Sequence, residues 1–190
     1  MDVDPDTTAI VVVDMQNDFC HPDGALYAPG SEDAIEPISS LVERGRAAGT
    51  EIAFTRDVHP EGQFEDAYYM NEFERWGKHV LEGSWGAEIV DGLAVEPVDL
   101  VIEKRTYDAF YGTDFETVLE DRGVTDLLFV GTLANVCVLH TAGSAGLRDF
   151  KPVLVSDALG YLEADHRRYA LEHAEWVFGE TTTRAAVEFL

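Results

Sequence analysis

Lysine is scarce in this chain of 190 residues, which carries three lysines and ten arginines against 37 aspartates and glutamates. The formal net charge is −24 at pH 7. A surface this acidic repels other polyanions, so we expect neither nucleic acid nor an anionic membrane among the partners. Acid-rich, lysine-poor surfaces are typical of proteins from a high-salt cytoplasm, and the composition therefore predicts a halophilic origin.

We expect the fold to lose stability at low ionic strength, because dissolved salt screens the repulsion between like charges. The measurement is the melting temperature in dilute buffer and in molar potassium chloride. Equal melting temperatures in the two solutions would contradict a halophilic adaptation.

Long apolar runs and a disulfide framework are also lacking. No run approaches the length that spans a bilayer, and the acidic segment 1–6 does not resemble the basic start of a secretory signal. The two cysteines, Cys20 and Cys137, are enough for one disulfide, but their number and spacing do not resemble a disulfide framework. The lack of a membrane-spanning run and of a secretory start favours a cytoplasmic protein. The length and the 46% of hydrophobic residues favour a single domain over residues 1–190.

Hydrophobic periodicity alternates between strands and helices along the chain. We expect strands over 9–13, 51–55, 100–103, 126–130 and 152–156, and helices over 35–48, 114–122, 136–148 and 164–177. A short strand and a terminal helix are expected near 180–189, while 57–97 has no clear period and is typical of a long functional loop. This alternation predicts an α/β fold of the doubly wound, Rossmann-like kind, with three α/β/α layers and a parallel sheet of about six strands.

Four chemically active side chains fall just past the ends of predicted strands. They are Asp14, Asp57, Lys104 and Cys137. Ligands bind doubly wound sheets at the carboxyl ends of the strands, near the point where strand order reverses. We therefore expect these four groups to converge on one pocket.

Cys137 lies between a predicted strand and the start of a predicted helix. The N-terminus of a helix favours the negative thiolate and lowers the pKa of a cysteine. An isolated buried cysteine is more often structural than reactive. The presence of Asp14 and Lys104 at two other strand ends favours a nucleophile. Two simpler interpretations stay open, in which Asp14 only caps a loop and Lys104 pairs with a surface carboxylate.

Three separated segments resemble the isochorismatase-like cysteine hydrolases. They are 11–19 (VVVDMQNDF), 103–113 (EKRTYDAFYGT) and 131–142 (GTLANVCVLHTA). The segment 76–88 (WGKHVLEGSWGAE) is similar to the nicotinamidases, or pyrazinamidases, of that family. The resemblance extends from about residue 9 to residue 158.

The resemblance implies a catalytic triad of Asp14, Lys104 and Cys137. Asp14 would accept the thiol proton, Lys104 would stabilise the thiolate, and Cys137 would attack an amide carbonyl. The backbone amides of Leu133 and Cys137 would bind the oxyanion, with a cis peptide between Thr132 and Leu133. The implied reaction converts nicotinamide to nicotinate and ammonia, as in NAD salvage, through a cysteine thioester.

The resemblance also implies one divalent transition metal, with zinc as the first candidate and iron or manganese as alternatives. Its ligands would be Asp57, His59 and His79, and Glu72 stands where some family members supply a fourth. Aromatic walls for a flat substrate ring would come from Phe19, Trp76 and Tyr107. Ordinary packing in the core is the alternative for those three side chains.

Several positions depart from the nicotinamidase pattern. They are Gly77, Lys78, Asp108, Ala134 and Asn135. The run from Asn135 to Val138 also suits metal-free relatives that cleave N-carbamoyl or ureido compounds, so such an amidohydrolase is the alternative. A thiol redox protein that pairs Cys20 with Cys137, and a non-catalytic scaffold, are further alternatives. For an enzyme of this family we expect a small-molecule amide as substrate and a homo-oligomer.

Overall fold

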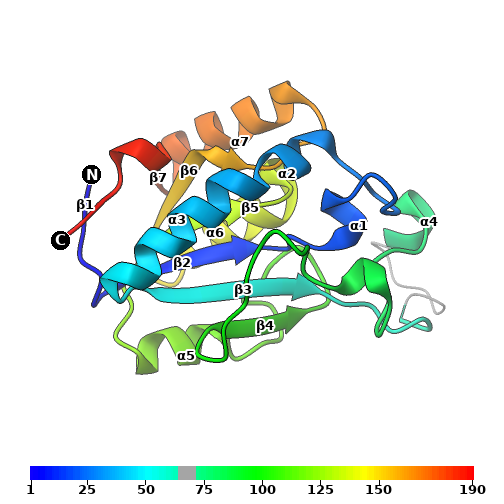
Figure 1. Ribbon diagram of the computed structural model, residues 1–190, viewed down its shortest axis with the longest axis horizontal. Coiled ribbons are helices and arrows are strands. Elements are labelled where there is room, and N and C mark those ends of the chain that lie inside the picture. Colours follow the sequence, from blue (N-terminus) through cyan, green and yellow to red (C-terminus); the bar gives the residue numbers. More distant parts are fainter. Residues whose placement is uncertain (64–71) are drawn as a thin grey trace.

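The computed structural model describes residues 1–63 and 72–190, and a parallel sheet of six strands runs through its centre (Figure 1). The predicted three-layer α/β fold is confirmed. The strand order is β4-β3-β2-β5-β6-β7. The strands are β2 (Thr8–Val13), β3 (Glu51–Asp57), β4 (Leu100–Lys104), β5 (Asp126–Gly131), β6 (Lys151–Leu159) and β7 (Glu180–Thr182), and a separate parallel pair joins β1 (Asp2–Val3) to β8 (Glu188–Phe189).

Helices cover both faces of the sheet. They are α1 (Asn17–Cys20), α2 (Pro29–Asp33), α3 (Ile35–Ala48), α4 (Glu72–Trp76), α5 (Phe115–Asp121), α6 (Leu139–Gly146) and α7 (Ala164–Val177). Two single turns of 3-10 helix, η1 (Trp85–Ala87) and η3 (Arg184–Ala186), and a π-helix, η2 (Ala134–Val138), complete the regular structure of the described ranges.

The central strand β2 is buried along its whole length because both of its faces are covered. Ile10 and Val12 pack in the core cluster that contains the apolar side of α3, whereas Val11 and Val13 pack in the cluster that contains residues of α5, α6 and α7. Burying each such aliphatic side chain contributes about 1.5 to 3 kcal/mol. The two cores thereby fix the direction and register of β2.

The chain reverses its direction of growth across the sheet at β2. It runs outward from β2 through β3 to β4, and then returns to place β5 on the other side of β2. The carboxyl ends of β2 and β5 therefore meet at the reversal point, where ligands bind in such folds. Gly131 ends β5 with φ of 109°, and a Cβ there would lie 2.2 Å from the carbonyl oxygen of Val13. Only glycine allows this close approach.

Two predicted helices need correction. The helix expected over 136–148 starts as the π-helix η2 and continues as α6, and the terminal helix expected near 180–189 is the single turn η3 between two short strands. The helices α1, α2 and α4 and the turn η1 were not predicted, because elements of three to five residues are too short to show a helical period.

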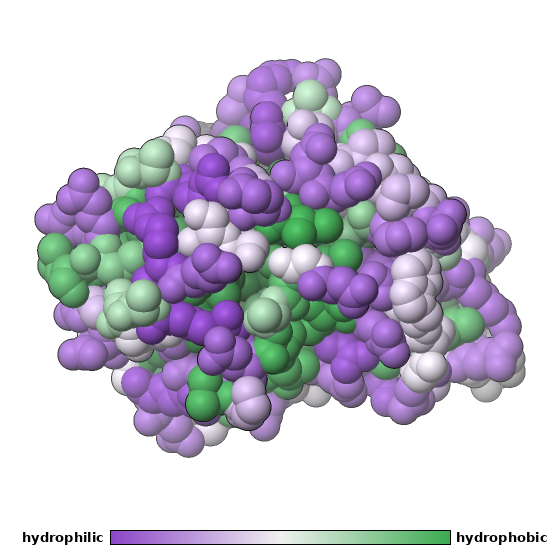
Figure 2. All heavy atoms as spheres, in the orientation of Figure 1, coloured by the Kyte–Doolittle hydropathy of each residue, from purple (hydrophilic) through white to green (hydrophobic). Residues whose placement is uncertain are grey.

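The face seen in Figure 2 is mainly hydrophilic, with hydrophobic residues gathered near its centre. Partly buried arginines pair with exposed acidic residues, as in the contacts of Arg56 with Glu103 and of Arg184 with Glu36. In the ranges that the structure describes, no helix is long and apolar enough to cross a membrane.

Candidate active site

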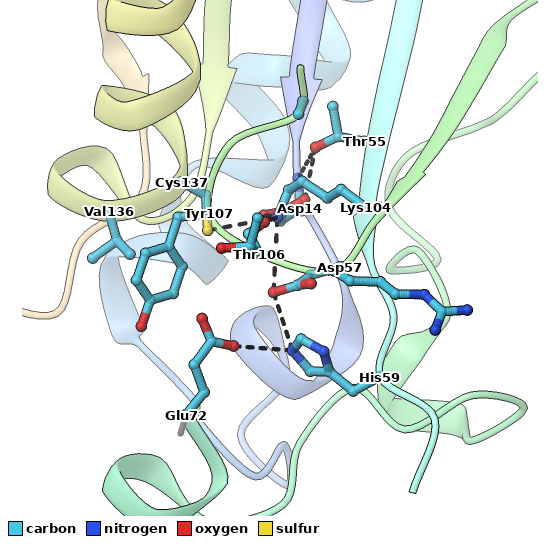
Figure 3. A network of polar contacts seen from close by, with 12 residues as sticks. Asp14, Thr55, Asp57, His59, Glu72, Lys104, Thr106, Tyr107, Val136 and Cys137 are labelled. Atoms are coloured by element: carbon cyan, nitrogen blue, oxygen red, sulfur yellow. Dashed lines mark hydrogen bonds and ion pairs between the residues drawn. The ribbon is translucent and has the colours of Figure 1, made fainter. Parts of the chain in front are cut away.

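The four side chains predicted to converge do so at the carboxyl ends of the central strands (Figure 3). Asp14 follows β2, Asp57 ends β3, Lys104 ends β4, and Cys137 lies in η2 just after β5. The Lys104 Nζ atom lies 2.6 Å from Asp14 Oδ2, 3.7 Å from Asp57 Oδ2 and 3.8 Å from Cys137 Sγ. All four residues are buried.

Lys104 is the central cation of this group. Its side chain is fully shielded from solvent, and Nζ also donates a hydrogen bond of 2.8 Å to the carbonyl oxygen of Thr106. Burial alone would lower the lysine pKa, but the carboxylates of Asp14 and Asp57 outweigh it and raise the pKa above its ordinary value. Lys104 is therefore charged at neutral pH, and it does not form the surface ion pair considered as an alternative.

Thr55 of β3 orients the carboxylate of Asp14. Its hydroxyl donates a hydrogen bond of 2.6 Å to Asp14 Oδ1, which leaves Oδ2 directed at Lys104. Asp14 itself has a φ of 48°, an uncommon conformation for a non-glycine residue that points to functional strain. Burial raises the pKa of Asp14, and the nearby positive charge of Lys104 opposes this increase.

The Cys137 thiol differs from the expectation in one respect. Its pKa is raised well above the ordinary value, because burial dominates and the negative charges of Asp14 and Asp57 add to it, whereas Lys104 opposes the increase. The expected lowering by a helix N-terminus is therefore wrong. The thiol lies in a π-helical turn, where desolvation outweighs any favourable helix dipole. The resting residue is a neutral thiol that needs a base.

The turn that carries the thiol also carries the two backbone amides expected to bind an oxyanion. A cis peptide bond joins Thr132 to Leu133, at the place that the resemblance implied, and Leu133 caps the N-terminus of η2. The Thr132 hydroxyl lies 2.5 Å from the hydroxyl of Ser31, and both residues are buried. The amides of Leu133 and Cys137 belong to the same turn, because Leu133 is the N-cap of the π-helix that contains Cys137.

A second cluster of ligand-type side chains lies next to the first. Ligand atoms of His59, Glu72 and His79 lie within 4.8 Å of one another, and all three residues are buried. His59 Nε2 lies 3.1 Å from Glu72 Oε2 and 3.4 Å from Asp57 Oδ2. Asp57 stands between the two groups, since its carboxylate also falls within 4.8 Å of Asp14 and Cys137.

This second cluster fits a divalent cation. Within the part of the chain that the structure describes, Asp57 Oδ1 and both carboxylate oxygens of Glu72 are buried without a hydrogen bond of ordinary geometry, although Glu72 Oε2 lies close to His59 Nε2. Buried polar atoms without partners are rare in proteins and call for an explanation such as an ion. Two imidazoles with one or two carboxylates form a donor set that suits zinc, iron or manganese.

The two histidines have their other ring nitrogens held by the protein. His59 Nδ1 lies 3.3 Å from Gln63 Oε1, and His79 Nδ1 lies 2.7 Å from the carbonyl oxygen of Gly77. Such contacts fix the orientation of a histidine ligand. Burial lowers the pKa of His59, but its contacts with Asp57 and Glu72 raise it to about 9.

The predicted aromatic residues occupy different environments. Phe19 is buried with its ring 6.2 Å from that of His79, and Trp76 is 56% exposed at the end of α4. Tyr107 is half-buried and points toward Glu72 (Figure 3). Burial and the charge of Glu72 raise its pKa to about 12. Phe19 and Tyr107 thus border the two clusters, and Trp76 stands at the surface.

Three nearby residues were not predicted to take part. Gln16 donates hydrogen bonds to the carbonyl oxygens of Asp57 and Ala87 and accepts one from the Asp57 amide, so it clamps the backbone of a cluster residue. Phe73 places its ring 5.5 Å from His59. Val136 lies across from Tyr107 in Figure 3. The only signal for Gln16 in the sequence was its place within the 11–19 motif.

The chain is similar to known proteins along nearly its whole length. A family model described as "Isochorismatase domain" matches residues 8–186. The chain is 29% identical over 203 residues to the ureidoacrylate amidohydrolase RutB of Caulobacter vibrioides, covering 96% of this chain and 90% of the relative.

Two solved structures show the same fold. A cysteine hydrolase from Pseudomonas syringae pv. phaseolicola has a TM-score of 0.88 at 31% identity, covering 96% of this chain and 91% of that one. The pyrazinamidase of Pyrococcus horikoshii in complex with zinc has a TM-score of 0.83 at 29% identity, covering 93% and 98%.

Proposed function

Because the chain belongs to the isochorismatase family of hydrolases, we propose that it is an amidohydrolase in which Cys137 is the nucleophile. The observation that carries this proposal is the contact of Lys104 with both Asp14 and Cys137 in a buried site. A thiol, a carboxylate and an ammonium group in this arrangement supply the nucleophile, the base and the balancing charge that amide cleavage needs.

The raised pKa of Cys137 requires its proton to move as the sulfur attacks. Asp14 accepts this proton, and Sγ forms a bond to the carbonyl carbon of the substrate amide. The carbonyl oxygen becomes an oxyanion, which the backbone amides of Leu133 and Cys137 stabilise. Lys104 keeps the carboxylate and the sulfur in place and offsets the negative charge.

Collapse of the tetrahedral intermediate breaks the C–N bond. Asp14 returns the proton to the leaving nitrogen, and a thioester on Cys137 remains. Asp14 then takes a proton from water as the water attacks the thioester carbon. The acid product leaves and Sγ recovers its proton from Asp14, so the reaction consumes one water and changes no oxidation state.

Two substrate classes follow from different observations. The ureidoacrylate amidohydrolases among the relatives support an N-carbamoyl or ureido substrate, the alternative of the sequence analysis, better than they support nicotinamide. The cluster of His59, Glu72 and His79 favours nicotinamide, the first substrate that the sequence analysis predicts, because that reaction was expected to use a metal. The hypothesis of a metal-dependent enzyme is also supported by the structural similarity to a pyrazinamidase that was solved in complex with zinc.

If the metal is present, His59, His79 and Glu72 would hold it, and Asp57 would either bind it directly or orient His59. An ion of the zinc type supplies a Lewis-acid site for a pyridine nitrogen, which would orient the ring of nicotinamide. Phe19 and Trp76 would then form the walls on either side of the substrate ring, and Tyr107 would be a further contact.

The proposal is tested by incubating the enzyme with nicotinamide, ureidoacrylate and an N-carbamoyl amino acid, in high salt, with and without a chelator. We expect one class to be consumed, with an acid or amine product and ammonia detected chromatographically. If the enzyme hydrolyses nicotinamide and the chelator abolishes this activity, the result supports a metal-dependent nicotinamidase. If it cleaves a ureido or N-carbamoyl compound and the chelator has no effect, the result supports the metal-independent amidohydrolase. Failure on all three substrates would contradict the proposed amidohydrolase.

Metal affinity should depend steeply on pH. The proton on His59, whose pKa is about 9 in the metal-free site, must leave before the imidazole can bind a metal. Below that pKa the apparent Kd for zinc should therefore rise about tenfold for each pH unit lost, from this residue alone. Titration calorimetry at about pH 6 and about pH 8 in buffers of different ionisation enthalpy measures the affinity and the released proton. Equal affinities would exclude His59 as a ligand.

A further inference from the structure

We propose that Asp18 is a positioning residue that holds His79 in the ligand cluster by fixing the backbone of Val80. This inference rests on the metal site of the proposed function. Asp18 belongs to the 11–19 motif, and no role for its side chain followed from the sequence. It lies in α1, just before Phe19, whose ring borders His79.

The carboxylate of Asp18 accepts hydrogen bonds from two backbone amides, one 7 residues and one 62 residues away in the chain. Its Oδ2 atom accepts a hydrogen bond of 2.6 Å from the Val80 amide, and its Oδ1 atom accepts one of 3.0 Å from the Ala25 amide. Asp18 is 8% exposed. Hydrogen bonds from backbone amides to an ionised carboxylate are about twice as strong as neutral ones, more so when buried.

Val80 needs such an anchor because its backbone is unusual. This fully buried valine has a φ of 39°, a left-handed conformation that is a genuine outlier for a β-branched side chain. A conformation of this kind persists only where the surroundings hold it. The bond to Asp18 supplies that constraint at the amide that directly follows His79.

Val80 also links the two histidines of the cluster. Its carbonyl oxygen accepts a hydrogen bond of 3.0 Å from the His59 amide, and the His59 carbonyl accepts one of 3.0 Å from the Glu82 amide. Asp18 therefore binds the backbone amide of Val80, and His59 binds its carbonyl oxygen. Displacing Val80 would move His79 relative to His59 and change the spacing between their ring nitrogens.

The packing around Asp18 leaves its carboxylate no freedom. A Cβ added to Gly86 in η1 would lie 2.3 Å from the carboxylate carbon and from one of its oxygens. Gly86 has no positive φ, so its backbone accepts alanine, and the three atoms nearest to the added Cβ all belong to the Asp18 carboxylate. Gly86→Ala therefore pushes the carboxylate without removing its charge.

The test compares Asp18→Asn with the matched control Asp23→Asn, which removes the same charge from a side chain that is 87% exposed nearby. Asparagine keeps the shape, but at one position it presents an amide that cannot accept from a backbone N–H. Zinc affinity is measured by competition with a chromophoric chelator, and the exchange of the Val80 amide by hydrogen–deuterium mass spectrometry. Alkylation of Cys137 by iodoacetamide reports whether the triad remains intact.

We expect Asp18→Asn to weaken zinc binding about 10- to 100-fold and to speed exchange at Val80, with the Cys137 alkylation rate changed less than about twofold. The control should match the wild type in all three. If Asp18→Asn fails to fold, Gly86→Ala should shift affinity and exchange in the same direction. Wild-type affinity and exchange in both variants would overturn the proposal while leaving the proposed function untouched. A wild-type protein that binds no zinc would contradict the metal site itself, whatever its amidase activity.

Discussion

Replacing Cys137 with alanine should lower kcat/KM by at least about 10⁴-fold, because a reaction through a thioester has no path without the sulfur. The residual rate would come from binding and from the backbone amides alone. Cys137 is buried beside Lys104, and alanine removes one atom from a small space, so the fold should persist. Circular dichroism and the melting temperature verify this, and ammonia or acid release measures the activity.

The matched control for this variant is Cys20→Ala, which removes the other cysteine of the chain. Cys20 is also buried, and burial raises its pKa to about 12, so it is an unreactive thiol at neutral pH. Turnover in this variant should match the wild type. Retention of activity in Cys137→Ala would contradict the nucleophile, and with it the proposed chemistry.

The same pair of variants bears on the redox alternative. Both cysteines are free, and they belong to different core clusters, with Cys20 packed near Met15 in the cluster that contains α3. A disulfide requires Cβ atoms about 4 Å apart, which side chains in separate cores do not provide. The geometry therefore favours hydrolysis over disulfide exchange, and loss of activity in Cys20→Ala would be the result that revives the alternative.

The sequence predicted the regular elements that carry a long or continuous apolar pattern. The helix expected over 35–48 matches α3, because its apolar face repeats over four turns and Gly49 ends it in a left-handed conformation. The strand expected over 9–13 matches β2 because both faces of a central strand are buried. Once the alternation fixed a doubly wound sheet, the meeting of Asp14, Lys104 and Cys137 followed from their places at strand ends.

The supporting contacts could not be predicted, because they join residues far apart in the chain. Thr55 lies 41 residues from Asp14, and Asp18 lies 62 residues from Val80, and no local pattern links either pair. The raised pKa of Cys137 was missed for a related reason. It depends on how completely neighbouring segments exclude water, which a helix start in the sequence does not reveal. The segment 64–71, part of the predicted loop over 57–97, lies outside the described residues.

Replacing Lys104 with methionine should have the largest effect on stability. Lys104 is the cation between Asp14 and Asp57, whose carboxylates lie within 4.8 Å of each other and are almost fully buried. Removing one partner of a buried ion group leaves uncompensated charge and costs about 3 to 5 kcal/mol. For a chain of this size, that loss lowers Tm by roughly 6 to 20 °C. Calorimetry measures the shift, and amide hydrolysis should fall together with it, because Asp14 loses the positive charge that opposes the rise of its pKa on burial.

The pH dependence separates this electrostatic cause from a simple packing defect. In the wild type, despite its burial, Asp57 has a lowered pKa through Lys104 and His59, so its contribution is present above the unfolded pKa and is lost as the pH falls through the folded value. Without Lys104 the pKa values of Asp14 and Asp57 rise. The two buried carboxylates then destabilise the fold most at neutral pH, and this destabilisation decreases as they become protonated in acid. The difference in Tm between the wild type and Lys104→Met should therefore decrease on acidification. Adding Asp14→Asn to Lys104→Met should restore part of the stability but none of the activity.

The matched control is Lys151→Met, at a side chain that is 74% exposed beside Asp126, and it should change Tm by no more than about 2 °C. A deficit that is independent of pH, or equal in the two lysine variants, would show that Lys104 does not balance the buried carboxylates.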